Sequence, residues 1–158
     1  MTKTSLITTI AVVCSLTFLG TVGDSQDKPI KKDLKLAFVP KNINNPYNVI
    51  ETKGSLDACQ EISAQGKVVG PSDASASSQV SYINTLITQR QNAIVLAAND
   101  PNALIPYLKR AREQKIQIVT MDSDTAPEGR KVFINQASSE GIGQGQVQIL
   151  AKQIDFKG

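Results

Sequence analysis

The sequence predicts an α/β fold, a parallel sheet with helices on both faces. Short apolar runs typical of buried strands alternate with stretches whose apolar residues recur at helical spacing. The segments between successive strands are long enough to hold a helix, which parallel strands require. With right-handed crossovers, the expected strand order in the sheet begins 2-1-3-4.

The first strand is expected at 34–39, where an apolar run ends at Pro40. A polar loop leads to Pro46, which suits the first turn of a helix because its missing N–H needs no partner there. This helix is expected over 46–64, and Gly66 follows in the usual stop position. Its apolar residues recur every four positions and predict a narrow buried face, made of Ile50, Gly54, Ala58 and Ile62.

The rest of the chain continues the alternation. Strands are expected at 67–69, 93–97, 116–121 and 132–134, and helices at 78–91, 102–114 and 138–154. The run 93–97 is apolar throughout, as expected for a strand covered on both faces. Inward faces are expected at Val80, Ile83, Leu86 and Ile87 in one helix and at Leu104, Leu108 and Ala111 in the next.

The N-terminus is typical of an export signal. Lys3 gives a positive start, and Leu6–Leu19 is a mostly apolar run of about 14 residues, short for a membrane span. Small residues follow, so we expect residues 1–23 to be a signal peptide and the chain to leave the cytoplasm. The alternative is a single membrane anchor.

The two cysteines indicate neither a lipid anchor nor a disulfide. Cys14 lies inside the expected signal and follows the bulky Val13, whereas a lipid anchor calls for a small residue there. Cys59 would then be the only cysteine of the mature chain, without a partner for a disulfide. We expect it to be a small residue of the core.

Composition excludes several function classes. The 158 residues, 41% of them apolar, allow about one domain, and His is absent, which removes imidazole bases and His metal ligands. The net charge of +3 comes without a basic stripe, so no nucleic-acid partner is expected. Gly141, Gly143 and Gly145 do not complete a dinucleotide-binding pattern, because Gln146 stands at the next required glycine. We therefore predict no catalytic residue, no metal ligand and no cofactor.

Polar side chains gather where the predicted strands end, and ligands of open α/β sheets bind beyond these carboxyl ends. Carboxylates and amides can each bind two hydroxyls, and a flat ring can cover the C–H face of a sugar. This mixture predicts a site for a neutral polyol, with Lys41, Asn45, Tyr47, Asn99, Asp100, Asp122 and Asp124 as ligand contacts. Asn135 and Gln136 follow the last strand at the same edge.

Most of these residues have a structural alternative. Asn99 and Asp100 also suit the cap of the following helix, and Asp124 suits a turn. Asn45 and Tyr47 also suit the loop that leads into the first helix.

Lys41 also suits a solvated loop, whereas Asp122 directly follows an apolar strand, where a chance surface carboxylate is less expected. Asp122 and Asp124 could form an acid–base pair, but a two-residue spacing within a loop suits that chemistry poorly.

Three longer stretches carry a further signal: FVPKNINNPY, GPSDASASSQVSYINTLITQRQNAIVLAANDPNALIPYLKRA and TMDSDTAPEGRKVFINQASSEGIGQGQVQILAKQI. With their PK, NNPY, ANDP and DSDTAP motifs they resemble the periplasmic sugar-binding proteins of bacterial ABC importers. The resemblance extends over nearly all of 34–154 and is strongest to the rhamnose-binding branch, which is similar to autoinducer and ribose binders.

The resemblance implies a monosaccharide ligand held between two hinged α/β lobes in the periplasm, a membrane permease as partner and no catalytic role. It places ligand contacts at Lys41, Asn45, Tyr47 and Asp122. Ser123 stands where ribose-like members place an arginine.

Members of this family are about twice as long as this chain. The resemblance therefore implies that residues 24–134 form an incomplete first lobe. It also implies that 135–158 contain the hinge crossing and the first helix of a second lobe that is mostly missing. The helix at 138–154 would then have no sheet to cover its apolar side, and we expect weak or absent sugar binding by this chain alone.

Two other function classes use similar sheets. The sugar-sensing core of a transcription regulator shares the fold, but such proteins carry an N-terminal helix-turn-helix where this chain carries an export signal. An enzyme on a doubly wound sheet is the other alternative, and the motifs that would mark one are missing.

Overall fold

The five strands form one sheet in the order β2-β1-β3-β4-β5, and every neighbouring pair is parallel. The computed structural model describes residues 31–156, so the expected signal peptide at 1–23 lies outside the described residues. The strands are β1 (Lys35–Val39), β2 (Gln65–Val68), β3 (Ala93–Leu96), β4 (Gln117–Met121) and β5 (Val132–Ile134). The predicted fold class and strand order are confirmed.

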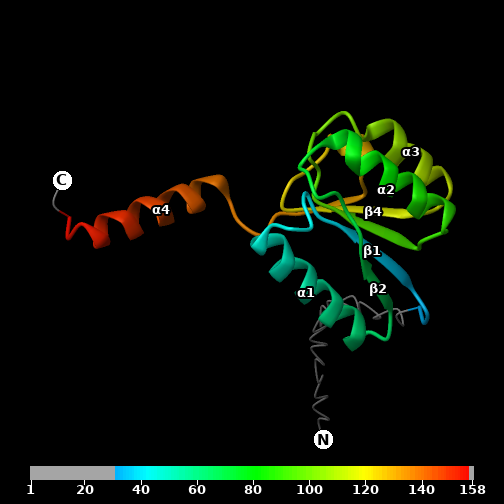
Figure 1. Cartoon of the computed structure of the whole chain (residues 1–158), viewed down its shortest axis with the longest axis horizontal. Helices are drawn as coiled ribbons and strands as arrows, with labels where there is room; N and C mark the ends of the chain where they lie inside the picture. The colour runs from blue at the N-terminus through cyan, green and yellow to red at the C-terminus, as the bar shows by residue number, and fades with distance from the viewer. Residues whose placement is uncertain (1–30, 157–158) are drawn as a thin grey trace, which may run out of the picture.

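Helices cover both faces of this sheet (Figure 1). Helix α1 (Pro46–Glu61) lies on one face, and α2 (Ala76–Thr88) and α3 (Ile105–Glu113) lie on the other. A short 3-10 helix, η1 (Pro127–Gly129), precedes β5, and α4 (Ser139–Gln153) follows it. Within the described part of the chain, no helix combines the length and the apolar character needed to cross a membrane.

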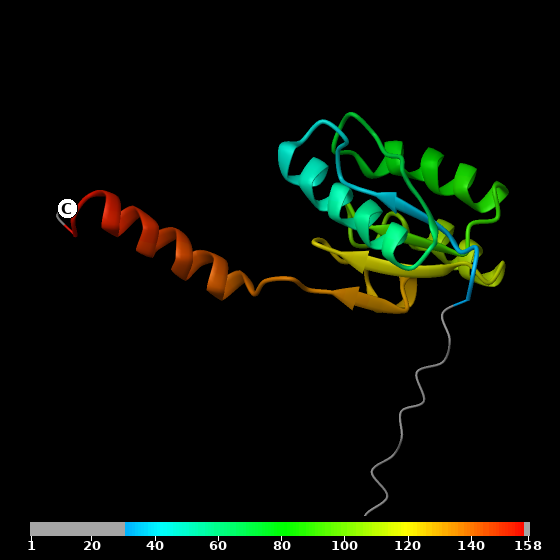
Figure 2. The same cartoon turned by 90° about the horizontal axis from the view of Figure 1, so that it is seen from below.

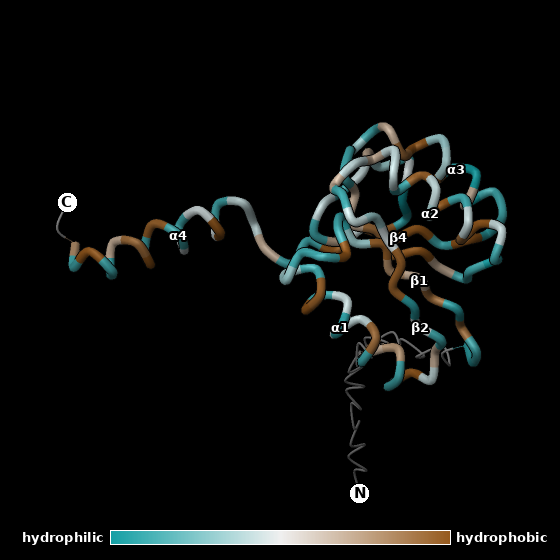
Figure 3. Tube along the Cα trace, viewed as in Figure 1, coloured by the Kyte–Doolittle hydropathy of each residue, from teal (hydrophilic) through white to brown (hydrophobic). Residues whose placement is uncertain are grey.

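The main core lies between the sheet and the pair α2 and α3. The inward faces predicted for these helices are confirmed: Ile83, Leu86, Ile87, Leu104, Leu108 and Ala111 are buried, with Val80 packed at the margin. They meet Ala37, Val39, Ile94, Leu96 and Ile118 from the strands. Figure 3 shows the hydrophobic segments concentrated in these strands. Apolar burial on this side is the main stabilising contribution to the fold.

The face predicted for α1 is wrong. Ile50 is 75% exposed, Ile62 is 38% exposed, and Gly54 and Ala58 also face solvent. The fully buried residues of the helix are Asn48 and Cys59, so the expectation for Cys59 is confirmed.

Hydrogen bonds at the start of α1 explain why a different side of the helix meets the sheet. The Asn48 side chain donates a hydrogen bond to the Asn42 carbonyl at 2.8 Å, and Asn45 caps the helix through the Tyr47 N–H at 2.9 Å. Thr52 on the inward side donates its hydroxyl to the helix backbone at 2.7 Å, which satisfies a polar group that would otherwise be costly to bury. Contacts made by the preceding loop, rather than an apolar stripe, set which side of α1 meets the sheet.

Helix α4 points away from the sheet and buries none of its residues against the rest of the described chain (Figure 2). Its apolar residues Ile142, Val147, Ile149 and Leu150 are all at least half exposed. The sequence-based expectation that this helix lacks a covering sheet agrees with its position.

Leu86→Ala tests whether the core between the sheet and α2, rather than the apolar side of α4, stabilises the fold. Leu86 is 1% exposed, so its truncation is expected to lower the free energy of unfolding by about 2–5 kcal/mol. Leu150→Ala on α4 is the matched control, since Leu150 is 58% exposed, and it is expected to change stability by less than about 0.5 kcal/mol. Urea unfolding of the two variants measures both values. Equal losses would contradict the assignment of the core.

Candidate functional site

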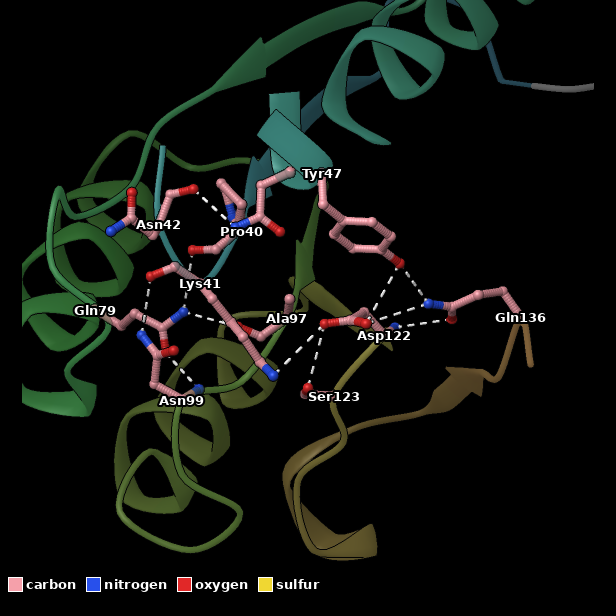
Figure 4. Close-up of polar contacts among 11 residues, drawn as sticks. Pro40, Lys41, Asn42, Tyr47, Gln79, Ala97, Asn99, Asp122, Ser123 and Gln136 are labelled. Atoms are coloured by element: carbon pink, nitrogen blue, oxygen red, sulfur yellow. Dashed lines mark hydrogen bonds and ion pairs between the residues drawn. The ribbon is translucent and has the colours of Figure 1, made fainter. Parts of the chain in front are cut away.

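Polar side chains from four strand ends meet at the carboxyl edge of the sheet (Figure 4). Lys41 follows β1, Asn99 follows β3, Asp122 follows β4 and Gln136 follows β5. Because all five strands run in one direction, residues up to 95 positions apart in sequence come to one edge.

An ion pair crosses the centre of this edge. The Lys41 Nζ lies 3.6 Å from Asp122 Oδ2, and the two side chains are 38% and 23% exposed. Strand β3 lies between β1 and β4, and its end at Ala97 and Ala98 is small enough for Lys41 to reach across it. A pair this exposed adds little to stability. Its effect is to place an ammonium group and a carboxylate side by side, facing solvent.

The carboxylate of Asp122 is held only by long contacts. Ser123 Oγ lies 3.3 Å from one oxygen, and Tyr47 Oη and Gln136 Nε2 lie 3.4 and 3.3 Å from the other. Strong hydrogen bonds to a carboxylate are about 2.5–2.9 Å long. The Asp122 oxygens can therefore accept shorter hydrogen bonds from the hydroxyls of a ligand.

Behind the ion pair, the buried amide of Gln79 on α2 joins two strand ends. Its Nε2 donates to the Ala97 carbonyl at 2.8 Å and to the Pro40 carbonyl at 3.3 Å. Its Oε1 accepts the N–H of Asn99 at 3.0 Å. Asn99 in turn donates to the Lys41 carbonyl at 3.1 Å. This chain of bonds fixes the backbone that carries Lys41 and Asn99.

Asp124 occupies a different environment from Asp122. Both of its oxygens accept from the Arg130 guanidinium at 2.7 Å, and one also accepts from Thr120 Oγ1 at 2.5 Å and from the Thr125 N–H at 2.8 Å. The hydrogen bonds from Arg130 hold the pKa of Asp124 below its ordinary value. These contacts use most of the acceptor capacity of Asp124, as the structural alternative for this residue requires.

Two more of the predicted contacts also make local structural bonds. Asp100 Oδ1 accepts the N–H groups of Asn102 and Ala103 at 2.8 and 2.7 Å, which lowers the pKa of Asp100. These bonds close a turn that precedes α3, whose first helical residue is Ile105. Asn45 is the N-cap of α1. The structure thus brings Lys41, Tyr47, Asn99 and Asp122 together and uses Asn45, Asp100 and Asp124 to shape the surrounding turns.

Comparison with known proteins identifies the family. Residues 36–158 match the family described as a periplasmic binding protein domain. The chain belongs to the periplasmic binding protein family.

Three solved structures show the same relationship. A sugar ABC transporter protein from Actinomyces odontolyticus is 39% identical with a TM-score of 0.69, over 79% of this chain and 40% of that chain. An ABC transporter solute-binding protein from Clostridium phytofermentas with bound L-rhamnose is 32% identical with a TM-score of 0.71, over 77% and 38%. LsrB from Clostridium saccharobutylicum in complex with AI-2 is 32% identical with a TM-score of 0.74, over 79% and 38%. The present chain thus spans about two fifths of the length of these proteins.

Sequence reasoning missed two residues of this periplasmic binding protein. Gln79 was not singled out, although it shares the helical face of Ile83 and Leu86, where a polar residue must be hydrogen-bonded. Glu51 was also missed, since nothing in the sequence marks its partial burial. Within residues 31–156, no group of three His, Cys, Asp or Glu side chains is placed to hold a metal ion.

Glu51 lies beside an apolar recess of about 310 Å³ that opens next to the ion pair. The recess is lined by Tyr47, Ile50, Glu51, Met121, Ile134 and Gln136. Glu51 Oε1 is buried and has no hydrogen-bond partner among the described residues. Burial raises the pKa of Glu51 above its ordinary value, the nearby charge of Asp122 raises it further, and Lys41 opposes both effects.

Glu51→Gln tests the cost of this carboxylate. A raised pKa in the folded protein means that ionised Glu51 destabilises the fold, so the variant is expected to be more stable at neutral pH. The advantage is expected to shrink as the pH falls through the raised pKa toward the ordinary value of 4.5, because wild-type Glu51 then becomes protonated in the folded state. Thermal unfolding across pH measures the difference.

Glu61→Gln, at the exposed end of the same helix, is the matched control and is expected to leave the melting temperature nearly unchanged at neutral pH. A Glu51→Gln variant that is less stable than wild type at neutral pH would contradict this account of Glu51.

Proposed function

We propose that this chain provides sugar-binding residues of a solute-binding protein for ABC-type carbohydrate import, acting in the periplasm and delivering its ligand to a membrane permease. Residues 24–134 form the first lobe of this protein, and 135–158 contain the crossing to a second lobe and its first helix. The single observation that carries the proposal is the Lys41–Asp122 ion pair, which is partly exposed to solvent at the carboxyl edge of the sheet beside Tyr47. Two of the three relatives support the same class, since one is a sugar ABC transporter protein and another has bound L-rhamnose.

The chemistry of this edge suits a polyol. Lys41 donates hydrogen bonds only, and ionised Asp122 only accepts them, so adjacent hydroxyls of one sugar can satisfy both. The Tyr47 ring is 50% exposed and can cover the apolar C–H face of the ring. An analogue lacking a hydroxyl would leave Lys41 or Asp122 without its partner, and this gives selectivity.

Rhamnose or a related monosaccharide is the proposed ligand. This choice is supported by the relative with bound L-rhamnose, which is 32% identical to this chain. The roles of Asn45, Asp100 and Asp124 are proposed to be indirect, through the turns that they shape around the central residues. One lobe offers only part of a closed site, so the sequence leads us to expect weak or absent binding by this chain alone. Because Lys41 and Asp122 already lie side by side in this lobe, we propose that binding is weak rather than absent.

Titration of the isotope-labelled full chain with L-rhamnose tests this function. Amide shifts are expected at Lys41, Asn99 and Asp122, with affinity no tighter than millimolar because only one side of the sugar is contacted. Asp122→Asn is expected to weaken binding at least about tenfold, since the charged acceptor is lost. Asp57→Asn, which changes an exposed carboxylate of α1 paired with Lys53, is the matched control and is expected to keep the sugar-dependent shifts.

Shifts confined to other parts of the chain, or a complete absence of shifts, would contradict the proposed site. Micromolar binding by calorimetry would contradict the expectation that this chain contributes only one side of the site.

A further inference from the structure

Gln136 belongs to the segment between β5 and α4, which consists of residues 135–138. Met121 and Ile134 are partners in the β4–β5 register, so the residues that follow each of them leave the sheet side by side. This places Gln136 next to Asp122, although the two belong to different strand ends (Figure 4). The segment that leaves the sheet thus passes directly beside the proposed sugar contacts.

Among the described residues, the Gln136 side-chain amide makes the hydrogen bonds that join this segment to Asp122 and Tyr47. Gln136 Oε1 accepts the backbone N–H of Asp122 at 3.2 Å. Its Nε2 donates to Tyr47 Oη at 2.8 Å and to Asp122 Oδ1 at 3.3 Å. A primary amide can accept and donate at once, whereas a carboxylate of the same length can only accept. Glutamine can therefore accept from the Asp122 N–H and donate to Tyr47 and the Asp122 carboxylate at the same time.

The backbone at Asp122 needs such support. Its φ of 60° lies in the left-handed region, which costs a non-glycine residue of order 1 kcal/mol or more. In this conformation the Asp122 N–H points to Gln136 rather than continuing the strand ladder. The same conformation brings the carboxylate to 3.6 Å from Lys41. Movement of the segment would therefore release both the backbone and the side chain of Asp122.

We propose that Gln136 is a positioning residue that couples the orientation of the 135–138 segment to the sugar contacts Asp122 and Tyr47. This inference rests on the proposed function, since it concerns the same site. Any ligand that prefers Asp122 and Tyr47 in their present positions also favours one orientation of the segment. By linkage, a segment held in that orientation strengthens ligand binding by the same factor.

Gln136→Ala tests the coupling by pulsed electron paramagnetic resonance. Spin labels are attached after Gln60→Cys on α1 and Gln148→Cys on α4, two exposed positions, in the full chain carrying Cys14→Ser and Cys59→Ala. Without sugar, the distance distribution is expected to be broader in Gln136→Ala than in the otherwise wild-type chain. Asn135→Ala is the matched control in the same segment, because among the described residues the Asn135 side chain accepts a hydrogen bond from the Ala137 N–H and makes none with Asp122 or Tyr47.

L-rhamnose supplies the second half of the experiment. It is expected to narrow the distance distribution of the wild-type chain and of Asn135→Ala, and to leave that of Gln136→Ala unchanged. Loss of the amide is also expected to weaken rhamnose binding about fivefold to tenfold, measured by amide shifts.

The Tyr47 phenol provides a readout that a merely structural role would not move. Burial raises the pKa of Tyr47, and the hydrogen bond from Gln136 opposes that rise. Gln136→Ala is expected to raise the Tyr47 pKa further, and Gln136→Glu to raise it most, because it replaces the donor with a second carboxylate. Ring-selective NMR titration separates Tyr47 from the other tyrosines, and Gln136→Glu keeps the side-chain length if Gln136→Ala does not fold.

The outcomes separate the two proposals. If rhamnose binds at the edge but Gln136→Ala matches wild type in distance distribution and affinity, the coupling is overturned and the proposed function stands. If rhamnose does not bind the wild-type chain, the proposed function is overturned, and the coupling to sugar falls with it. An unchanged Tyr47 pKa in both Gln136 variants would also overturn the positioning role.

Discussion

A fully buried amide on α2 is the constraint on which the site depends. Gln79 is bonded to the ends of β1 and β3 at once, through the Pro40 and Ala97 carbonyls and the Asn99 N–H. An apolar side chain at this position would remove the side-chain partner of the Asn99 N–H and of two buried carbonyls, at a cost of about 1–3 kcal/mol for each buried group left unpaired. Because these groups lie where the two strands end, the same amide that satisfies them also sets where Lys41 and Asn99 leave the sheet.

The two aspartates after β4 show how hydrogen-bond geometry separates a structural carboxylate from an available one. Asp124 lies two residues beyond Asp122, yet it is bound by a guanidinium, a hydroxyl and a backbone N–H at 2.5–2.8 Å. Asp122 has only contacts of 3.3–3.6 Å at its carboxylate. A ligand hydroxyl would compete easily with the second set and poorly with the first. The chain therefore fixes its loop with one carboxylate and leaves the other available to new hydrogen-bond donors.

The uncovered apolar surfaces of the described residues are consistent with the proposed two-lobed protein. Helix α4 exposes Ile149 and Leu150, and Ile134 on β5 is 51% exposed beside the recess that Tyr47 lines. The match covers 38–40% of the length of the three solved relatives described above. In the proposed two-lobed protein, α4 belongs to the second lobe, and the contacts of Gln136 lie at the crossing between the lobes.

The sequence by itself determined the alternation of strands and helices, their parallel order and the edge at which polar residues collect. These follow from hydrophobic periodicity and from the rule that parallel strands end together, both of which are local or nearly local signals. It also determined that Lys41, Tyr47 and Asp122 belong to one edge. The resemblance carried by motifs such as DSDTAP pointed to the family that the comparisons then established.

Only the tertiary structure decided which of these polar groups are already engaged and which remain available. The partners of Asp124, Asp100 and Gln79 depend on distances between side chains and backbone groups that sequence spacing does not encode. The side of α1 that meets the sheet was decided in the same way, by the hydrogen bond that Asn45 accepts and the one that Asn48 donates rather than by an apolar stripe. The role of Gln136 likewise arises from register, because the pairing of β4 with β5 brings its amide to the left-handed turn at Asp122.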